Sequence, residues 1–358
     1  MKTGGAASAS PDVIVLFSGG LDSLLSALLL REQGLVVRCW HACSPFFGKS
    51  GAVDFWRETY GLDVHTEDVS EDFVAMLLQG PAHGFGKALN PCVDCKIHLL
   101  RQARAYMEAT GAKALASGEV PGQRPMSQRR DAMQLISREA GVTDILVRPL
   151  GARLLAPTKP EREGLVDRSR LASMAGRGRS GQLALAARFG LKVIPTPGGG
   201  CRLTERENVR RYWPLFTNSI SPSAADFALA NLGRQFWARC GQVSFWLCVG
   251  RNREDNERIV AAAQAGDALL RLRDMAGPTA LARGGTHWPE KALLEAARLT
   301  AGFSPKALAC GEEAAVDILV DGREQTIQAR PGRDGFFVGP QPFTLVKEER
   351  KAYFPTSR

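Results

Sequence analysis

The chain has 358 residues and carries 46 lysines and arginines against 37 aspartates and glutamates, a formal net charge of +9. Its length predicts two domains, because a single hydrophobic core usually stops growing before a chain is this long, and its positive charge favours a polyanionic partner. No apolar run reaches membrane-spanning length and residues 1–10 lack the apolar core of a signal peptide, so we expect a cytoplasmic protein with no membrane partner.

In chain order, apolar runs alternate with stretches of helical period. Strands are predicted at residues 13–17, 35–40, 62–66, 113–117, 145–148 and 192–194, and helices at 21–33, 71–78, 93–109, 126–140 and 180–189. This alternation predicts an α/β fold, a Rossmann-like parallel sheet with helices on both faces. We place a boundary at residues 211–222, which gives an N-terminal domain of residues 1–211 and a smaller α+β domain of residues 222–358.

The first predicted strand runs directly into a loop that opens a helix, Ser18-Gly19-Gly20-Leu21-Asp22-Ser23. The two glycines let backbone N–H groups approach phosphate oxygens, and the two serines add hydroxyl donors at the helix N-terminus. A carboxylate is not attracted to phosphate, so we expect Asp22 to act through a bound magnesium ion or by fixing the loop. The alternative is a glycine-rich turn without a ligand, but the strand–loop–helix context favours nucleotide binding. Ligands of parallel sheets bind beyond the carboxyl ends of the strands, where residues 39–47 and 117–128 should join this loop.

Eight cysteines in a cytosolic chain are expected to be reduced thiols, metal ligands or nucleophiles rather than disulfides. Cys92 and Cys95 form a C-x-x-C at the start of a predicted helix, whose N-terminus should lower both thiol pKa values. Cys201 closes the glycine turn Gly198-Gly199-Gly200. Three thiolates can bind an iron–sulfur cluster with one iron left open, or Cys95 and Cys201 can relay a persulfide. Zinc is the weaker option because no fourth ligand completes the set, and a helix-capping C-x-x-C with an unrelated buried Cys201 is the structural alternative.

Residues 124–180 hold twelve basic side chains against six acidic ones. This excess is a candidate RNA footprint. The alternative is a solvated charged face, since no aromatic side chains are interleaved with the arginines.

Five segments together resemble the bacterial tRNA thiouridine synthases of the ATP-pyrophosphatase (PP-loop) type, which have a Rossmann-like fold of the HUP type. They are residues 18–23 (SGGLDS), 90–96 (NPCVDCK), 117–128 (SGEVPGQRPMSQ), 148–150 (RPL) and 199–204 (GGCRLT). The resemblance covers roughly residues 11–211.

The resemblance implies an ATP-dependent tRNA sulfurtransferase, which adenylates a tRNA uridine and replaces the activated oxygen with sulfur to give thiouridine. It implies binding of ATP and Mg²⁺ at Ser18, Gly19, Gly20, Asp22, Ser23 and Gly118, and catalytic roles for Asp22, Cys95 and Cys201. Cys92, Cys95 and Cys201 resemble the ligands of the cluster-dependent members, so we expect a 4Fe-4S cluster, with a persulfide relay as the alternative. The implied partners are tRNA and a sulfur donor such as a cysteine desulfurase or inorganic sulfide.

Residues 245–252, 266–278 and 296–304 resemble the NFACT-R RNA-binding domain. Arg271 stands where that family often has histidine, so no specific role is carried over to it. The basic side chains that suit phosphate contacts in this region are Arg251, Arg253, Arg271 and Arg273.

Two other functions compete with thiolation. One is an amide-forming ATP pyrophosphatase that adenylates a carboxylate and uses ammonia, which leaves the three cysteines without a role. The other is a non-catalytic RNA-binding protein whose first domain only senses nucleotide, against which the intact loop and the three cysteines argue.

Overall fold

The computed structural model describes residues 10–196, 200–219 and 221–355. The chain divides into two compact units, Met1–Thr204 and Glu205–Arg358. Within the described residues, no helix combines the length and the apolar character needed to cross a membrane. The predicted identities of the two domains, with ranges 1–211 and 222–358, stay predictions.

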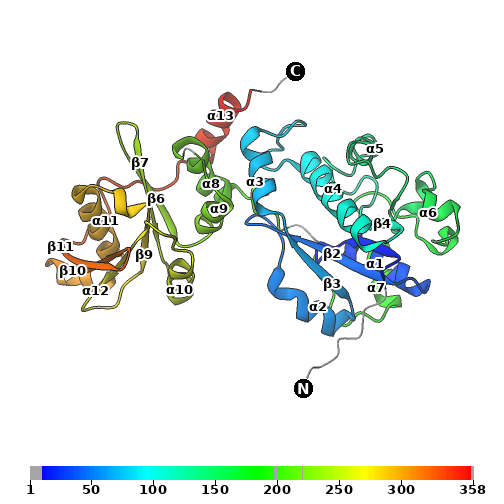
Figure 1. The fold of residues 1–358 in the computed structure, drawn as a ribbon, viewed down its shortest axis with the longest axis horizontal. Helices are drawn as coiled ribbons and strands as arrows, with labels where there is room; N and C mark the ends of the chain where they lie inside the picture. The colour runs from blue at the N-terminus through cyan, green and yellow to red at the C-terminus, as the bar shows by residue number, and fades with distance from the viewer. Residues whose placement is uncertain (1–9, 197–199, 220, 356–358) are drawn as a thin grey trace. The chain divides into compact units, whose positions relative to one another are not determined.

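The first unit is built on a five-stranded sheet in which every neighbouring pair of strands is parallel (Figure 1). In spatial order the strands are β3 (Asp63–Asp68), β2 (Val37–Cys43), β1 (Val13–Leu16), β4 (Ala114–Ser117) and β5 (Leu146–Val147). The α-helices of this unit are α1 (Leu21–Glu32), α2 (Val53–Tyr60), α3 (Ser70–Gln79), α4 (Cys92–Thr110), α5 (Arg130–Glu139), α6 (Lys159–Arg162) and α7 (Ser180–Arg188). The predicted Rossmann-like parallel sheet is confirmed.

Side-chain alternation along β1 explains why helices cover both faces of this sheet. Val13 belongs to a buried cluster that includes Leu24 of α1. The next residue, Ile14, belongs to a different buried cluster that includes Leu100 of α4. Because successive side chains of a strand point to opposite faces, a strand that is apolar at every position requires a helical layer on each side.

Two predictions for this unit are wrong in detail. Residues 192–194 form no strand, and Val193 and Ile194 are each 48% exposed. An apolar run this short gains little by pairing, and the Tyr60 hydroxyl instead donates to the Val193 carbonyl at 3.0 Å. The helix predicted from residue 126 begins at Arg130, because the preceding residues form a closed loop in which the Gly122 N–H donates to the Gln128 carbonyl.

The second unit is an α+β structure with a six-stranded antiparallel sheet. In spatial order the strands are β11 (Arg323–Ala329), β10 (Ala314–Val320), β8 (Ala268–Leu272), β9 (Ala280–Arg283), β7 (Val243–Val249) and β6 (Arg234–Cys240). Its helices are α8 (Arg206–Asn218), α9 (Ala224–Ala230), α10 (Arg253–Ala261), α11 (Glu290–Gly302), α12 (Pro305–Cys310) and α13 (Phe343–Tyr353). The predicted second α+β domain is confirmed as a fold class.

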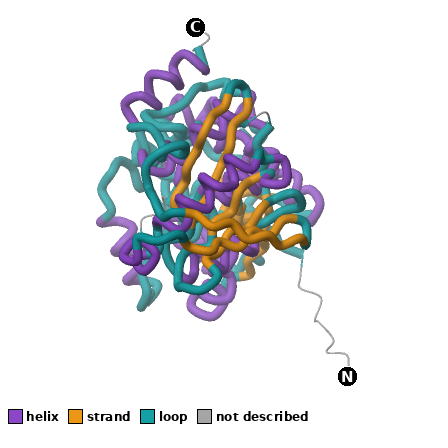
Figure 2. The backbone as a smooth tube through the Cα atoms, turned by 90° about the vertical axis from the view of Figure 1, so that its left-hand side faces the viewer, coloured by secondary structure: helices purple, strands orange, loops and turns teal. Residues whose placement is uncertain are grey.

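One face of this second sheet packs on α11. Leu247 and Val249 of β7 share a buried cluster with Ala296 and Ala297 of α11. Figure 1 shows α11 beside the strands of this unit, and Figure 2 draws strands in orange. The alanines allow the helix to approach the sheet closely, which increases the apolar area removed from water.

Candidate active site

The loop after β1 is held in shape by its own side chains. The Ser23 hydroxyl donates to the Gly20 carbonyl at 2.9 Å and accepts from the Ser18 N–H at 3.2 Å. Gly19 has φ of +76°, and a Cβ there would lie 2.6 Å from a ring carbon of Trp56. Gly20 is the N-cap of α1 and has no side chain to accept from the first-turn amides, which can therefore donate to an anion such as phosphate.

The end of β4 packs directly against the first turn of α1. A Cβ on Gly118 would lie 2.6 Å from the carbonyl carbon of Asp22 and 2.6 Å from the amide nitrogen of Ser23. Only a glycine fits between these backbones without displacing one of them. The structure thus brings Gly118 next to the loop, as the resemblance implied.

Asp22 and Gln123 face each other beside the loop, and together they fit a magnesium ion. The Gln123 side-chain amide donates to one Asp22 carboxylate oxygen at 3.1 Å. The other Asp22 oxygen and the Gln123 carbonyl oxygen are buried and have no hydrogen-bond partner among the described residues. A cation can satisfy buried oxygens that have no donor, and Mg²⁺ prefers oxygen ligands from the protein together with phosphates and water. Sequence reasoning gave Gln123 no role of its own.

Glu119, one residue beyond Gly118, is a buried carboxylate that links β4 to α4. It accepts from the Ser117 hydroxyl at 3.0 Å and from Arg148 Nε at 3.1 Å, and Lys96 Nζ of α4 lies 3.8 Å away. Burial alone raises the pKa of Glu119, but the charges of Lys96 and Arg148 lower it by more, so the net shift is downward and the group stays ionised. This network joins the end of β4 to the cysteine-bearing helix α4, and the sequence alone did not predict it.

The structure places Cys201 near enough to Cys95 for the two thiols to influence each other electrostatically. Burial raises the pKa of the Cys95 thiol, and the Cys201 thiol raises it further. Cys201 is brought there by backbone bonds of the residues after it, because Arg202 N–H donates to the Phe46 carbonyl at 2.9 Å and Leu203 accepts from the Leu89 N–H at 3.1 Å.

The prediction that the helix N-terminus lowers the Cys95 pKa is wrong. The residue is partly exposed, but the burial of its thiol raises the pKa by more than the nearby Lys96 charge lowers it. Cys92 is the first residue of α4, where its sulfur accepts from the Asn90 side-chain amide at 3.1 Å. The glycine turn predicted before Cys201 lies partly outside the described residues, since 197–199 are not among them.

Within the described part of the chain, no three Cys, His, Asp or Glu side chains are grouped so that they can hold a metal ion. Cys92, Cys95 and Cys201, as placed here, therefore do not fit a 4Fe-4S cluster, although Cys201 and Cys92 both lie near enough to Cys95 to raise its pKa. No step below passes through a cluster.

No family model matches the chain. A tRNA-specific 2-thiouridylase MnmA of Nitratidesulfovibrio vulgaris is 34% identical over 115 residues, which cover 30% of this chain and 32% of that protein. A bifunctional protein NifU/MnmA of Rubrobacter xylanophilus is 30% identical over 137 residues, 33% of this chain and 27% of that protein. These partial similarities support a relationship between this chain and the PP-loop family. The chain thus spans about a third or less of the length of the curated relatives that it matches.

Among solved structures, this chain is similar to a predicted subunit of tRNA methyltransferase from Methanocaldococcus jannaschii. The sequence identity is 19%, the TM-score is 0.28, and the match covers 38% of this chain and 68% of that one. A likeness of this size carries no argument about function.

Proposed function

We propose that the chain is an ATP-dependent tRNA sulfurtransferase, which adenylates a tRNA uridine and exchanges its oxygen for sulfur to give thiouridine. The observation that supports the proposal most is that one unit contains the glycine loop before α1, the Asp22 and Gln123 oxygens that have no partner among the described residues, and the neighbouring thiols of Cys95 and Cys201. The partial similarity to two MnmA proteins, one a tRNA-specific 2-thiouridylase, supports the choice of tRNA and sulfur. An amide-forming enzyme needs no such thiol pair.

The first step proposed is adenylation. The uridine oxygen attacks the α-phosphorus of ATP, the bond to the β-phosphate oxygen breaks, and pyrophosphate leaves. The first-turn amides of α1 donate to the phosphate oxygens and stabilise the charge that develops at phosphorus. Mg²⁺ held by the Asp22 and Gln123 oxygens would neutralise charge on the departing pyrophosphate.

The second step is sulfur transfer through the thiol pair. Cys201 receives a sulfur atom from a persulfide-bearing donor protein, whose own thiol is regenerated. The terminal sulfur attacks the activated ring carbon, and AMP leaves with the former uridine oxygen. The Cys95 thiol then attacks the Cys201 sulfur, which frees the thiouridine and leaves a disulfide for an external dithiol to reduce. We assign the receiving role to Cys201 because the Cys95 sulfur is shielded by burial, which raises its pKa.

Pyrophosphate release tests the adenylation step. Wild-type protein with ATP and Mg²⁺ should release pyrophosphate only when tRNA is added, and Asp22→Ala should reduce this release about a hundredfold or more. The matched control is Asp54→Ala, because the Asp54 side chain is 83% exposed on α2, and it should keep the wild-type rate within about twofold.

Three outcomes would contradict the proposal. Release in Asp22→Ala at the wild-type rate would remove Asp22 from the site. Release that requires a carboxylate and ammonia instead of tRNA would favour the amide-forming enzyme. An absence of ATP turnover in every condition would favour a nucleotide-sensing protein.

A further inference from the structure

Two arginines of the second unit stack on one aromatic ring. The Arg234 guanidinium carbon lies 4.6 Å from the centroid of the Phe303 ring, and that of Arg333 lies 4.7 Å from the same centroid. The two guanidinium carbons are therefore no further apart than the sum of these two distances. Arginine on an aromatic face is fixed in orientation while the edge of its guanidinium stays free to donate.

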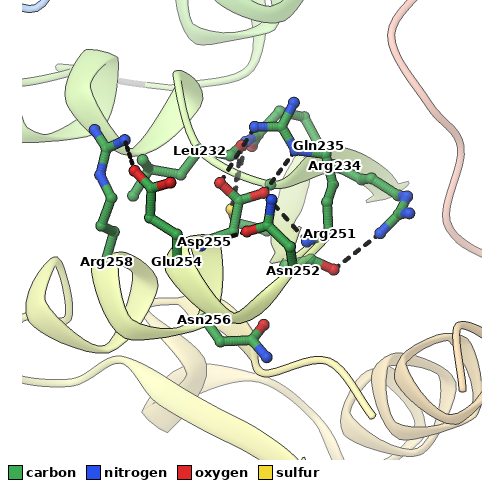
Figure 3. A network of polar contacts seen from close by, with 12 residues as sticks. Leu232, Arg234, Gln235, Arg251, Asn252, Glu254, Asp255, Asn256 and Arg258 are labelled. Carbon is green, nitrogen blue, oxygen red and sulfur yellow. Dashed lines mark hydrogen bonds and ion pairs between the residues drawn. The ribbon is translucent and has the colours of Figure 1, made fainter.

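Backbone carbonyls fix the same two side chains further. Arg234 Nη1 donates to the Gly250 carbonyl at 2.8 Å, and Arg333 Nε donates to the Gly302 carbonyl at 2.6 Å. Each guanidinium has five N–H donors, and most donors on both arginines have no acceptor among the described residues. Figure 3 shows Arg234 beside Arg251, the residue that follows Gly250.

The positive charge around these arginines exceeds the negative charge. Asp255 is buried and binds Arg251, with Nε and Oδ2 2.6 Å apart, as Figure 3 shows. Among the residues that the structure describes, Arg234 and Arg333 form no ion pair with a carboxylate. Burial lowers the pKa of Arg234, and the charges of Arg251 and Arg333 lower it further. Like charges held this close repel one another, and a bound anion would relieve that repulsion.

We propose that Arg234 and Arg333, here called the arginine cluster, bind phosphate groups of an RNA backbone, while Arg251, which is already paired with Asp255, adds positive charge beside them. Guanidinium groups in fixed orientation match the geometry of phosphate oxygens. The choice of RNA, rather than another phosphate-bearing ligand, rests on the proposed function, in which tRNA is the substrate.

The structure also sets this cluster apart from the other arginines that the sequence suggested. Arg253 is paired with Glu257, with Nε and Oε1 2.8 Å apart, and Arg273 is paired with Asp317, with Nη2 and Oδ1 2.7 Å apart. A carboxylate partner must be displaced before such an arginine can bind phosphate, whereas Arg234 and Arg333 need no displacement.

The test measures binding of a tRNA transcript to the full chain by fluorescence anisotropy over a range of salt concentrations. The double variant Arg234→Gln, Arg333→Gln should raise Kd about tenfold or more near 0.1 M salt. It should also reduce the slope of log Kobs against log salt by about 1.5 to 2. The matched control is Arg258→Gln, Arg323→Gln, which removes the same charge from two exposed positions of this unit and should stay within about twofold.

A third variant separates lost binding from lost folding. Arg234→Lys, Arg333→Lys keeps both charges and should restore most of the salt slope but only part of the affinity, because lysine lacks the planar fork. Thermal unfolding should show both double variants to be folded at the assay temperature.

Equal losses in the double variant and its control, or no RNA binding by wild-type protein, would overturn the arginine cluster. The proposed function fails differently. If wild-type protein makes no thiouridine but binds RNA through Arg234 and Arg333, the cluster stands and sulfur transfer does not. If wild-type protein makes thiouridine but the double variant binds RNA as tightly as wild type does, the proposed function stands and the arginine cluster does not.

Discussion

Replacing Glu119 with glutamine should destabilise the first unit, because it removes a buried charge between two cations. Arg148, 11% exposed, and Lys96, 29% exposed, would lose their shared partner. Removing one partner of a buried ion pair costs about 3–5 kcal/mol. Lys96 can turn partly to water, so we expect the lower end, about 3 kcal/mol. For a unit of this size that loss corresponds to a fall in Tm of about 6–12 °C.

Differential scanning calorimetry measures this change directly. The matched control is Glu163→Gln, whose carboxylate is 64% exposed and lies 3.9 Å from Lys159, and it should change the free energy of unfolding by less than about 0.5 kcal/mol. A Tm of Glu119→Gln within 2 °C of wild type, which corresponds to a change of about 1 kcal/mol or less, would refute the network as a source of stability.

The pH dependence of the same pair of proteins checks the cause. The pKa of Glu119 is lowered in the folded state, so its contribution is present above the unfolded pKa of about 4.3 and is lost as pH falls through the folded value. The stability difference between wild type and Glu119→Gln should therefore be largest near neutral pH and shrink in acid. A difference that grows in acid would contradict the sign of the shift.

Three further predictions concern the loop and the thiols. Gly118→Ala should weaken ATP binding about tenfold or more in calorimetric titration, because its Cβ would collide with the first turn of α1. The control Gly178→Ala, at a position with open space around it, should bind ATP as tightly as wild type does. Equal affinities of the two variants would contradict the packing argument. Iodoacetamide at pH 8 should modify Cys95 at least about ten times more slowly than the exposed Cys240, because burial raises the Cys95 pKa. Peptide mass spectrometry measures both rates, and faster modification of Cys95 would refute the raised pKa. Anaerobic reconstitution with iron and sulfide should leave only substoichiometric iron on the protein, and a stable brown cluster that is lost on replacing Cys95 would reinstate the cluster mechanism.

Sequence periodicity was sufficient to predict the sheet of the first unit, because the strands of that sheet are apolar at consecutive positions and are separated by helices. β1 and β4, for example, are buried at every position. The run at 192–194 has only two apolar residues, Val193 and Ile194, and pairs with no strand among the described residues. Pairing is a tertiary property that a short run does not encode. The antiparallel order of the second sheet likewise depends on contacts between strands far apart in the chain.

The candidate site could be predicted where one segment carries it, as in the loop at residues 18–23. Glu119 and Gln123 lay in a recognised segment, but their roles depend on Arg148, Lys96 and Asp22, which the fold brings in from other elements. The Cys95 pKa was mispredicted for a related reason, since the helix terminus is a local feature and the burial that overrides it is not. Arg333 and Phe303 meet only in the folded second unit.

Nucleoside mass spectrometry of tRNA treated with the purified protein tests the central claim most directly. With ATP, Mg²⁺, a persulfide-bearing donor and a dithiol, the wild-type protein and the exposed-cysteine control Cys310→Ser should convert uridine to thiouridine, and Cys201→Ser should not. No thiouridine from wild-type protein, or a wild-type yield from Cys201→Ser, would contradict the account.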